Sequence, residues 1–160
     1  MVATCSAGSN NVLDISKIET GMASVNLSDV AVGELLAECE MVPRGLPETA
    51  GLSFKLDTTA PHPSYISVDR IKVKQILLNL LANAVKFTQP GGEVMLSVRG
   101  DASWIEIEVR DTGIGMSSNE IAVALRPFRQ VDESHTRKYQ GAGLGLSIVR
   151  GWWRSMAASS

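Results

Sequence analysis

The chain has 160 residues, and its 15 Lys and Arg against 17 Asp and Glu give a formal net charge of −2 at pH 7. Because the basic residues are scattered and few aromatic side chains are available for base stacking, we expect no nucleic-acid partner. Asn79 and Asn83 interrupt the richest apolar run. We therefore expect a cytoplasmic chain without membrane contact of its own, although its parent protein can still be membrane-anchored. Cys5 and Cys39 lack further ligands at metal-binding spacing, which argues against zinc and for free thiols.

The N-terminal segment divides into two parts. Residues 1–10 are small and polar without periodicity, and they predict a disordered lead. Residues 11–21 repeat apolar side chains at helical spacing as far as Gly21, which predicts a short amphipathic helix. A helix of this length is not stable alone, so its apolar stripe must pack on another element.

Four short elements are predicted before the central stretch: a strand over residues 25–27, a helix over about 30–42, and strands over 52–56 and 65–68. Ser28 or Asp29 can cap the helix, and Pro43 is expected to end it.

Residues 69–87 predict the central helix, with Asp69 as its cap. Its apolar side chains gather on one side, and a polar stripe made of Lys72, Gln75, Asn79, Asn83 and Lys86 falls roughly opposite. Asn is a poor helix former because it competes for backbone hydrogen bonds. Two Asn one turn apart therefore belong either to a solvated face or to a ligand site.

Two alternating apolar runs follow the helix, over residues 94–98 and 105–109. Each predicts a strand with one buried face, and the turn over residues 100–103 favours an antiparallel hairpin. One mainly antiparallel mixed sheet with helices on one face is expected. The predicted fold class is α+β, a two-layer α/β sandwich.

The second hairpin strand ends in Asp111, followed by Thr112-Gly113-Ile114-Gly115-Met116. A carboxylate followed by glycines lets the backbone approach a flat ligand closely, although a turn that merely needs glycine is an equal alternative. Residues from Met116 to about Gln140 predict a long mobile loop. The run Gly141-Ala142-Gly143-Leu144-Gly145-Leu146 then reads as a glycine-rich turn into a helix, a place suited to phosphate.

Taken together, these motifs resemble the ATP-binding domain of sensor histidine kinases, in the Bergerat-fold (GHKL) ATPase superfamily. LLANAVKFTQPGG is similar to the N box of that family, DTGIGM to its first glycine box, RPFRQVD to its Phe-containing box and GAGLGLSIV to its second glycine box. VLDISKIETG resembles the end of the dimerisation hairpin. The resemblance assigns residues 11–21 to that hairpin, 22–150 to the ATP-binding domain and 151–160 to an irregular tail.

The resemblance implies ATP and Mg²⁺ as cofactors and gives each motif a role. Asn83 would be the magnesium ligand, with Asn79 beside it. Lys86 would neutralise phosphate charge, and Phe87 would lie near the nucleotide. Asp111 would read adenine, with Gly113, Ile114 and Gly115 passing close to the base. The loop between the two glycine boxes would form the ATP lid, with Phe128, Arg137 and Lys138 contacting the nucleotide. Arg137 and Lys86 would be the catalytic residues. The residues implied to bind the phosphates are Gly141, Gly143, Leu144, Gly145 and Leu146.

The resemblance also implies a reaction, transfer of the ATP γ-phosphoryl group to a His on a dimerisation hairpin, with a response regulator downstream. The acceptor His is absent from this chain, so another polypeptide would have to supply it. Gln75 stands where related ATPases carry a water-activating Glu, which predicts little ATP hydrolysis. Two alternatives stay open, namely a non-catalytic nucleotide-responsive interaction module of the same fold and another ATPase of the superfamily.

Overall fold

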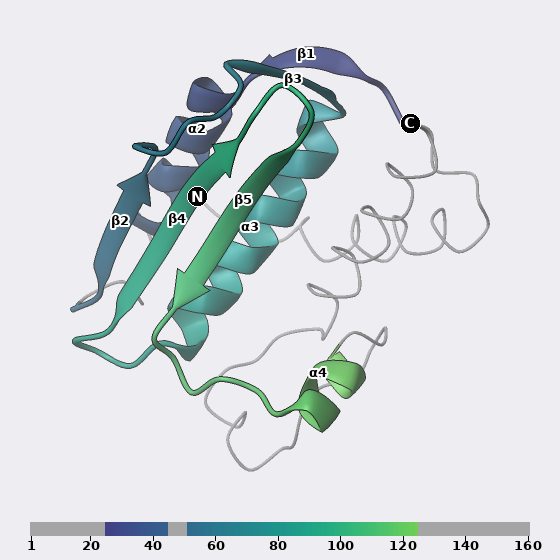
Figure 1. Ribbon diagram of the computed structural model, residues 1–160. Helices are drawn as coiled ribbons and strands as arrows, with labels where there is room; N and C mark the ends of the chain where they lie inside the picture. Colours follow the sequence, from purple (N-terminus) through teal and green to yellow (C-terminus); the bar gives the residue numbers. More distant parts are fainter. Residues whose placement is uncertain (1–24, 45–50, 125–160) are drawn as a thin grey trace, which may run out of the picture. The chain divides into compact units, whose positions relative to one another are not determined.

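The computed structural model describes residues 25–44 and 51–124 (Figure 1). Residues Asn26–Gly115 form one compact unit, and helix α4 (Ser118–Ala124) lies outside it in the chain. Within these ranges, no helix has both the length and the apolar character that a membrane crossing requires. The compact unit contains, in chain order, β1 (Ser28–Ala31), α2 (Val32–Arg44), β2 (Ser53–Asp57), β3 (Tyr65–Val68), α3 (Arg70–Phe87), β4 (Glu93–Gly100) and β5 (Ile105–Asp111).

The described strands form two sheets rather than the single sheet expected. β2, β4 and β5 make a three-stranded sheet in that order, with β2 parallel and β5 antiparallel to β4. β1 and β3 pair antiparallel with each other, Ser28 opposite Val68 and Ala31 opposite Tyr65. Each of these two strands runs almost directly into a helix, so they meet where α2 and α3 begin (Figure 1).

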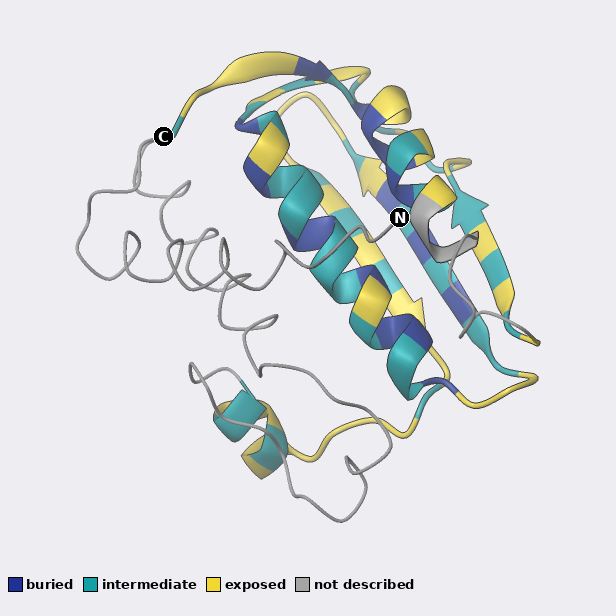
Figure 2. Cartoon of the chain, turned by 180° about the vertical axis from the view of Figure 1, so that it is seen from behind, coloured by how far each residue is buried: buried dark blue, intermediate teal, exposed yellow. Residues whose placement is uncertain are grey.

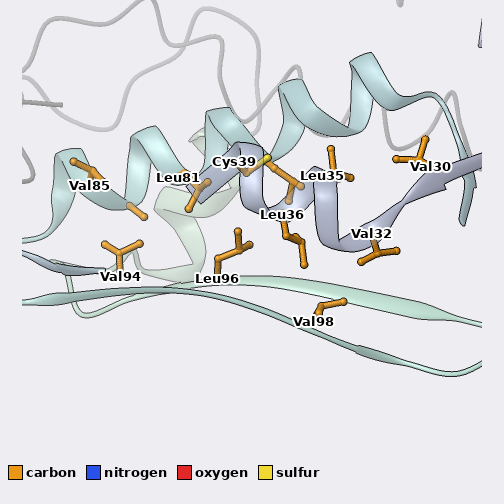
Figure 3. Packing of buried hydrophobic residues seen from close by; sticks show 12 residues of the cluster. Val30, Val32, Leu35, Leu36, Cys39, Leu81, Val85, Val94, Leu96 and Val98 are labelled. Atoms are coloured by element: carbon orange, nitrogen blue, oxygen red, sulfur yellow. The ribbon is translucent and has the colours of Figure 1, made fainter. Parts of the chain in front are cut away.

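Helices α2 and α3 cover the same face of the three-stranded sheet (Figure 2). Val94, Leu96 and Val98 of β4 alternate toward the helices and are at most 2% exposed. They pack against side chains of both helices, among them Leu36 and Leu81 (Figure 3). This confirms the predicted two-layer α/β sandwich, in which each buried leucine contributes about 1.5–3 kcal/mol of hydrophobic stabilisation.

The first turn of α3 is held by Asp69, as predicted. Its Oδ1 accepts the N–H of Lys72 at 3.2 Å, and its Oδ2 accepts the N–H of Asn26 at 3.0 Å. The Lys72 ammonium lies 3.2 Å from the same Oδ2. Lys72 is 8% exposed, because the buried carboxylate draws its ammonium inward.

Two neighbouring boundaries differ from the sequence prediction. The first strand lies at Ser28–Ala31 instead of residues 25–27, because it is defined by pairing with β3. Helix α2 consequently starts at Val32, and it ends at Arg44, one residue beyond Pro43. Strands β2 and β3 and helix α3 agree with prediction to within one residue.

Helix α4 (Ser118–Ala124) falls in the stretch predicted to be a mobile loop, so that prediction was wrong for these residues. Ser117 and Glu120 form a reciprocal capping box at its start. The Ser117 N–H donates to Glu120 Oε2 at 2.6 Å, and the Glu120 N–H donates to Ser117 Oγ at 3.4 Å. This Ser-x-x-Glu pattern is a helix-start signal that the sequence already carried.

Candidate nucleotide-binding site

The polar face of α3 carries Asn79, Asn83 and Lys86, spaced by four and three residues. This spacing places them on one side of the helix at successive turns. All three are half-buried, and none of them belongs to the apolar cluster. The structure therefore brings together the three N-box residues that the sequence singled out.

Asn79 has an unusual environment. Its Nδ2 is buried and has no hydrogen-bond partner in the part of the chain that the structure describes. An unsatisfied buried donor costs about 1–3 kcal/mol. Buried polar groups are normally paired, so an orphan of this kind calls for a specific explanation, such as a ligand.

At the end of α3, the Lys86 Nζ lies 5.1 Å from the centroid of the Phe87 ring, within the range of a cation–π interaction. Burial lowers the pKa of Lys86, because a desolvated ammonium is less stable relative to the neutral amine. The helix closes at Thr88, whose N–H and hydroxyl both donate to the Ala84 carbonyl, at 3.1 and 2.6 Å.

The glycine loop after β5 rests directly on this helix end. The N–H of Ile114 donates to the Phe87 carbonyl oxygen at 3.3 Å. A Cβ on Gly113 would lie 2.5 Å from the same oxygen, so only glycine fits there without movement. Gly115 has φ +67°, a left-handed conformation that favours glycine.

Asp111 is exposed at the end of β5. Its Oδ1 accepts the N–H of Gly113 at 2.8 Å, which fixes the side chain against its own loop. The exposed Ile114 follows in the same loop, 64% accessible to solvent. The carboxylate, the two glycines and the end of the N-box helix thus form one local arrangement.

One residue in this arrangement was missed in the sequence. Thr112 donates its N–H to the Glu93 carbonyl at 3.0 Å, and its Oγ1 accepts the Glu93 N–H at 2.9 Å. The sequence around Thr112 does not indicate this contact, because the partner residue, Glu93, lies at the start of the preceding strand, β4.

The other predicted site residues lie outside the described residues, and their roles stay predictions. They are Phe128, Arg137, Lys138, Gly141, Gly143, Leu144, Gly145 and Leu146.

The helix with two amides and a lysine and the Asp-x-Gly-x-Gly loop both fall within a stretch that matches a known family. Residues 68–159 match the model of the histidine kinase-, DNA gyrase B- and HSP90-like ATPases. The chain belongs to this family, and its resemblance to the ATP-binding domain of sensor histidine kinases is confirmed.

Two of the similar proteins carry kinase names. The autoinducer 2 sensor kinase/phosphatase LuxQ of Vibrio vulnificus strain YJ016 is 36% identical over 147 residues, which cover 88% of this chain and 17% of LuxQ. The cell-division control histidine kinase PdhS of Brucella abortus strain S19 is 40% identical over 158 residues, covering 88% of this chain and 14% of PdhS. The chain therefore spans only a small part of these relatives.

Among solved structures, full-length ShkA in complex with AMPPNP is similar with a TM-score of 0.77 and 30% identity. The match covers 92% of this chain and 30% of ShkA.

Proposed function

We propose that this chain is the catalytic domain of a sensor histidine kinase, which binds magnesium-ATP and transfers its γ-phosphoryl group to a His on a dimerisation hairpin. The observation that carries the proposal is the buried amide nitrogen of Asn79, which has no hydrogen-bond partner among the described residues and lies on the same helix face as Asn83 and Lys86. A nucleotide phosphate or its hydration shell would supply the acceptor that Nδ2 lacks.

The adenine base is assigned to Asp111. A carboxylate accepts a hydrogen bond from the exocyclic amine of adenine and repels the carbonyl that guanine carries at that position. The contact from the Gly113 N–H to Asp111 Oδ1 supports this role, because it restricts the orientation of the carboxylate. Gly113 and Gly115 then allow the loop to lie against the base.

The phosphates are assigned to the polar face of α3. The amide oxygen of Asn83 is the kind of hard ligand that Mg²⁺ prefers, and the triphosphate would supply the compensating negative charge. Lys86 would place its ammonium at the phosphates, where their charge would offset the effect of burial on its pKa. The bound magnesium-ATP would supply the transferable phosphoryl group, while the protein positions it and neutralises charge.

The partners follow from this reaction. The acceptor His would come from the dimerisation hairpin, to which residues 11–21 are predicted to belong, and a response regulator would receive the phosphoryl group next. The lid assignments, from Phe128 to Lys138, and the phosphate assignments at the second glycine box belong to the same proposal.

The decisive experiment combines calorimetry with a transfer assay. Magnesium-ATP should bind the chain with micromolar to millimolar affinity, and labelled ATP should phosphorylate a separately supplied His-bearing hairpin. In Asn83→Ala, magnesium should no longer strengthen nucleotide binding. Absence of any binding heat in the unsubstituted chain would overturn the proposal, whereas binding without transfer would favour a non-catalytic, nucleotide-responsive module.

A further inference from the structure

The strand pair β4 and β5 ends in an irregular way beside Asp111. Their antiparallel register runs from Gly100 opposite Ile105 to Val94 opposite Asp111. The next pair would be Glu93 with Thr112. In a regular ladder, such a hydrogen-bonded pair exchanges two bonds between backbone groups.

Only half of that exchange uses the backbone. The Thr112 N–H donates to the Glu93 carbonyl at 3.0 Å, as a ladder requires. The Glu93 N–H, however, donates to Thr112 Oγ1 at 2.9 Å. The side-chain hydroxyl takes the place that the carbonyl of Thr112 would occupy in a continued strand.

This replacement lets the chain turn out of the sheet at Thr112 while the first N–H of β4 stays paired. The turn begins the glycine loop, in which Gly113 donates to Asp111 Oδ1 at 2.8 Å and Ile114 donates to the Phe87 carbonyl at 3.3 Å. Both contacts depend on the direction in which the backbone leaves β5.

Thr112 is an exposed residue, but the start of β4 comes close to its hydroxyl. A Cβ on Gly92 would lie 2.9 Å from Thr112 Oγ1 and 2.4 Å from Thr88 Cγ2. Gly92 therefore allows the start of β4 to approach the Thr112 hydroxyl, and Thr88, the cap of α3, lies against the same point. The helix end, the start of β4 and the glycine loop therefore come together around Gly92.

We infer that Thr112 is a positioning residue for the nucleotide site: its hydroxyl sets the direction of the glycine loop and, through it, the orientation of the Asp111 carboxylate. The inference rests on the proposed function, because Asp111 is assigned there to adenine. Any residue with a hydroxyl on Cβ can serve, so Ser can replace Thr but Val cannot.

The test compares Thr112→Val, which keeps the shape without the hydroxyl, with Thr112→Ser, which keeps the hydroxyl. Thr59→Val is the matched control, because the Thr59 hydroxyl donates to Asp57 Oδ1 in the loop after β2, away from the glycine loop in the sequence. Calorimetry of the full chain with magnesium-ATP and magnesium-GTP measures affinity and base discrimination. Amide hydrogen exchange at Glu93, Gly113 and Ile114 measures the loop without nucleotide.

Thr112→Val should bind ATP about fivefold more weakly with GTP affinity nearly unchanged, as expected for one lost hydrogen bond that orients the base reader. Its amides at Glu93 and Ile114 should exchange faster. Thr112→Ser and Thr59→Val should match the unsubstituted chain within about twofold. Thr112→Ala gives the same comparison should the valine variant fail to fold.

Two results would overturn the inference alone: ATP binding and discrimination that are unchanged in Thr112→Val, or a loss in Thr112→Ser as large as in Thr112→Val. Failure of the unsubstituted chain to bind ATP would instead remove the proposed function itself. In that case the exchange data would show only a structural contact, and the nucleotide-positioning role would be rejected with it.

Discussion

The backbone N–H of Ile114 donates to the carbonyl oxygen of Phe87 at 3.3 Å. This bond joins the loop after β5 to the last residue of α3, so the glycine box and the N-box helix are connected through backbone atoms. The neighbouring Gly113 is held so close to the same carbonyl that a side chain has no room. The spacing between the two halves of the candidate site is therefore set by a backbone contact.

Replacement of Gly113 by Ala should disrupt this contact. The added Cβ would lie 2.5 Å from the Phe87 oxygen and 2.7 Å from Asp111 Oδ1, and overpacking of this kind costs about 1–3 kcal/mol. We expect Gly113→Ala to lower the free energy of unfolding by that amount in urea denaturation and to weaken ATP binding at least tenfold. Gly33→Ala is the control, since nothing lies within 4 Å of its added Cβ, and it should not lose stability.

Substitution of Asn79 is expected to have opposite effects on the stability of the chain and on its affinity for nucleotide. Its buried Nδ2 has no partner among the described residues, and Ala is the better helix former. Asn79→Ala should therefore raise the free energy of unfolding of the nucleotide-free chain by about 1 kcal/mol while weakening magnesium-ATP binding. Asn83→Ala is the comparison, because within the described residues Asn83 has no buried atom left unpaired, and this variant should gain only the difference in helix propensity. A clear loss of stability in Asn79→Ala would contradict the assignment of an unsatisfied donor.

Asp69 predicts the pH dependence of stability. Burial is the largest single influence and acts to raise its pKa, but the N–H groups of Asn26 and Lys72 and the Lys72 ammonium together lower it below the ordinary value of 3.8. A carboxyl whose pKa is lower in the folded state stabilises the fold above its unfolded pKa, and this contribution is lost as the pH falls through the folded value. Asp69→Asn should cost about 1 kcal/mol at pH 7, and the difference should shrink below pH 3.8.

Urea denaturation at a series of pH values would measure this effect. Asp29→Asn is the control, because Asp29 is an exposed residue of β1 and its substitution should change stability by less than about 0.5 kcal/mol. A stability difference between Asp69→Asn and the unsubstituted chain that stays constant from pH 7 to pH 3 would contradict the role assigned to the charged carboxylate.

Lys86 predicts the pH dependence of nucleotide affinity. Because burial lowers the pKa of its ammonium, ATP affinity should begin to fall with rising pH earlier than it would for an ordinary lysine. Lys86→Met should bind magnesium-ATP tenfold or more weakly, as for loss of a hydrogen bond to a charged group, about 1.5–3 kcal/mol. The ATP affinity of Lys86→Met should also not fall as the pH rises into the alkaline range. Lys86→Arg keeps its charge at high pH, so titration calorimetry should show a flat alkaline profile.

Local periodicity was sufficient to predict the helices and strands whose boundaries are set by their own sequence. The predicted β3 coincides with the observed strand, and α3 begins after the predicted cap, Asp69. The buried alternation of β4 was also read correctly. β1 could not be placed in the same way, because Ser28–Ala31 forms a strand only by pairing with β3, far along the chain.

In the candidate site, too, features set by the local sequence could be predicted, whereas contacts with distant residues could not. The spacing of Asn79, Asn83 and Lys86 was sufficient to place them on one helix face, and the end of a strand was sufficient to select Asp111. The contact that joins the two groups runs through the Phe87 carbonyl, which every residue type possesses, so no sequence pattern can reveal it. Thr112 was missed for a related reason, since its hydroxyl replaces a backbone acceptor for a distant N–H.

The parallel pairing of β2 with β4 has a consequence for the order of folding. It places Ser53 beside Glu93, and parallel strands are joined only after the intervening crossover, here β3 and α3, has closed. Closing so long a segment carries an entropic cost that slows folding. Because Glu93 is also the anchor of the glycine loop, we expect the loop to take shape late. ATP would then bind only chains that have already folded and would protect them from unfolding and proteolysis in proportion to its concentration.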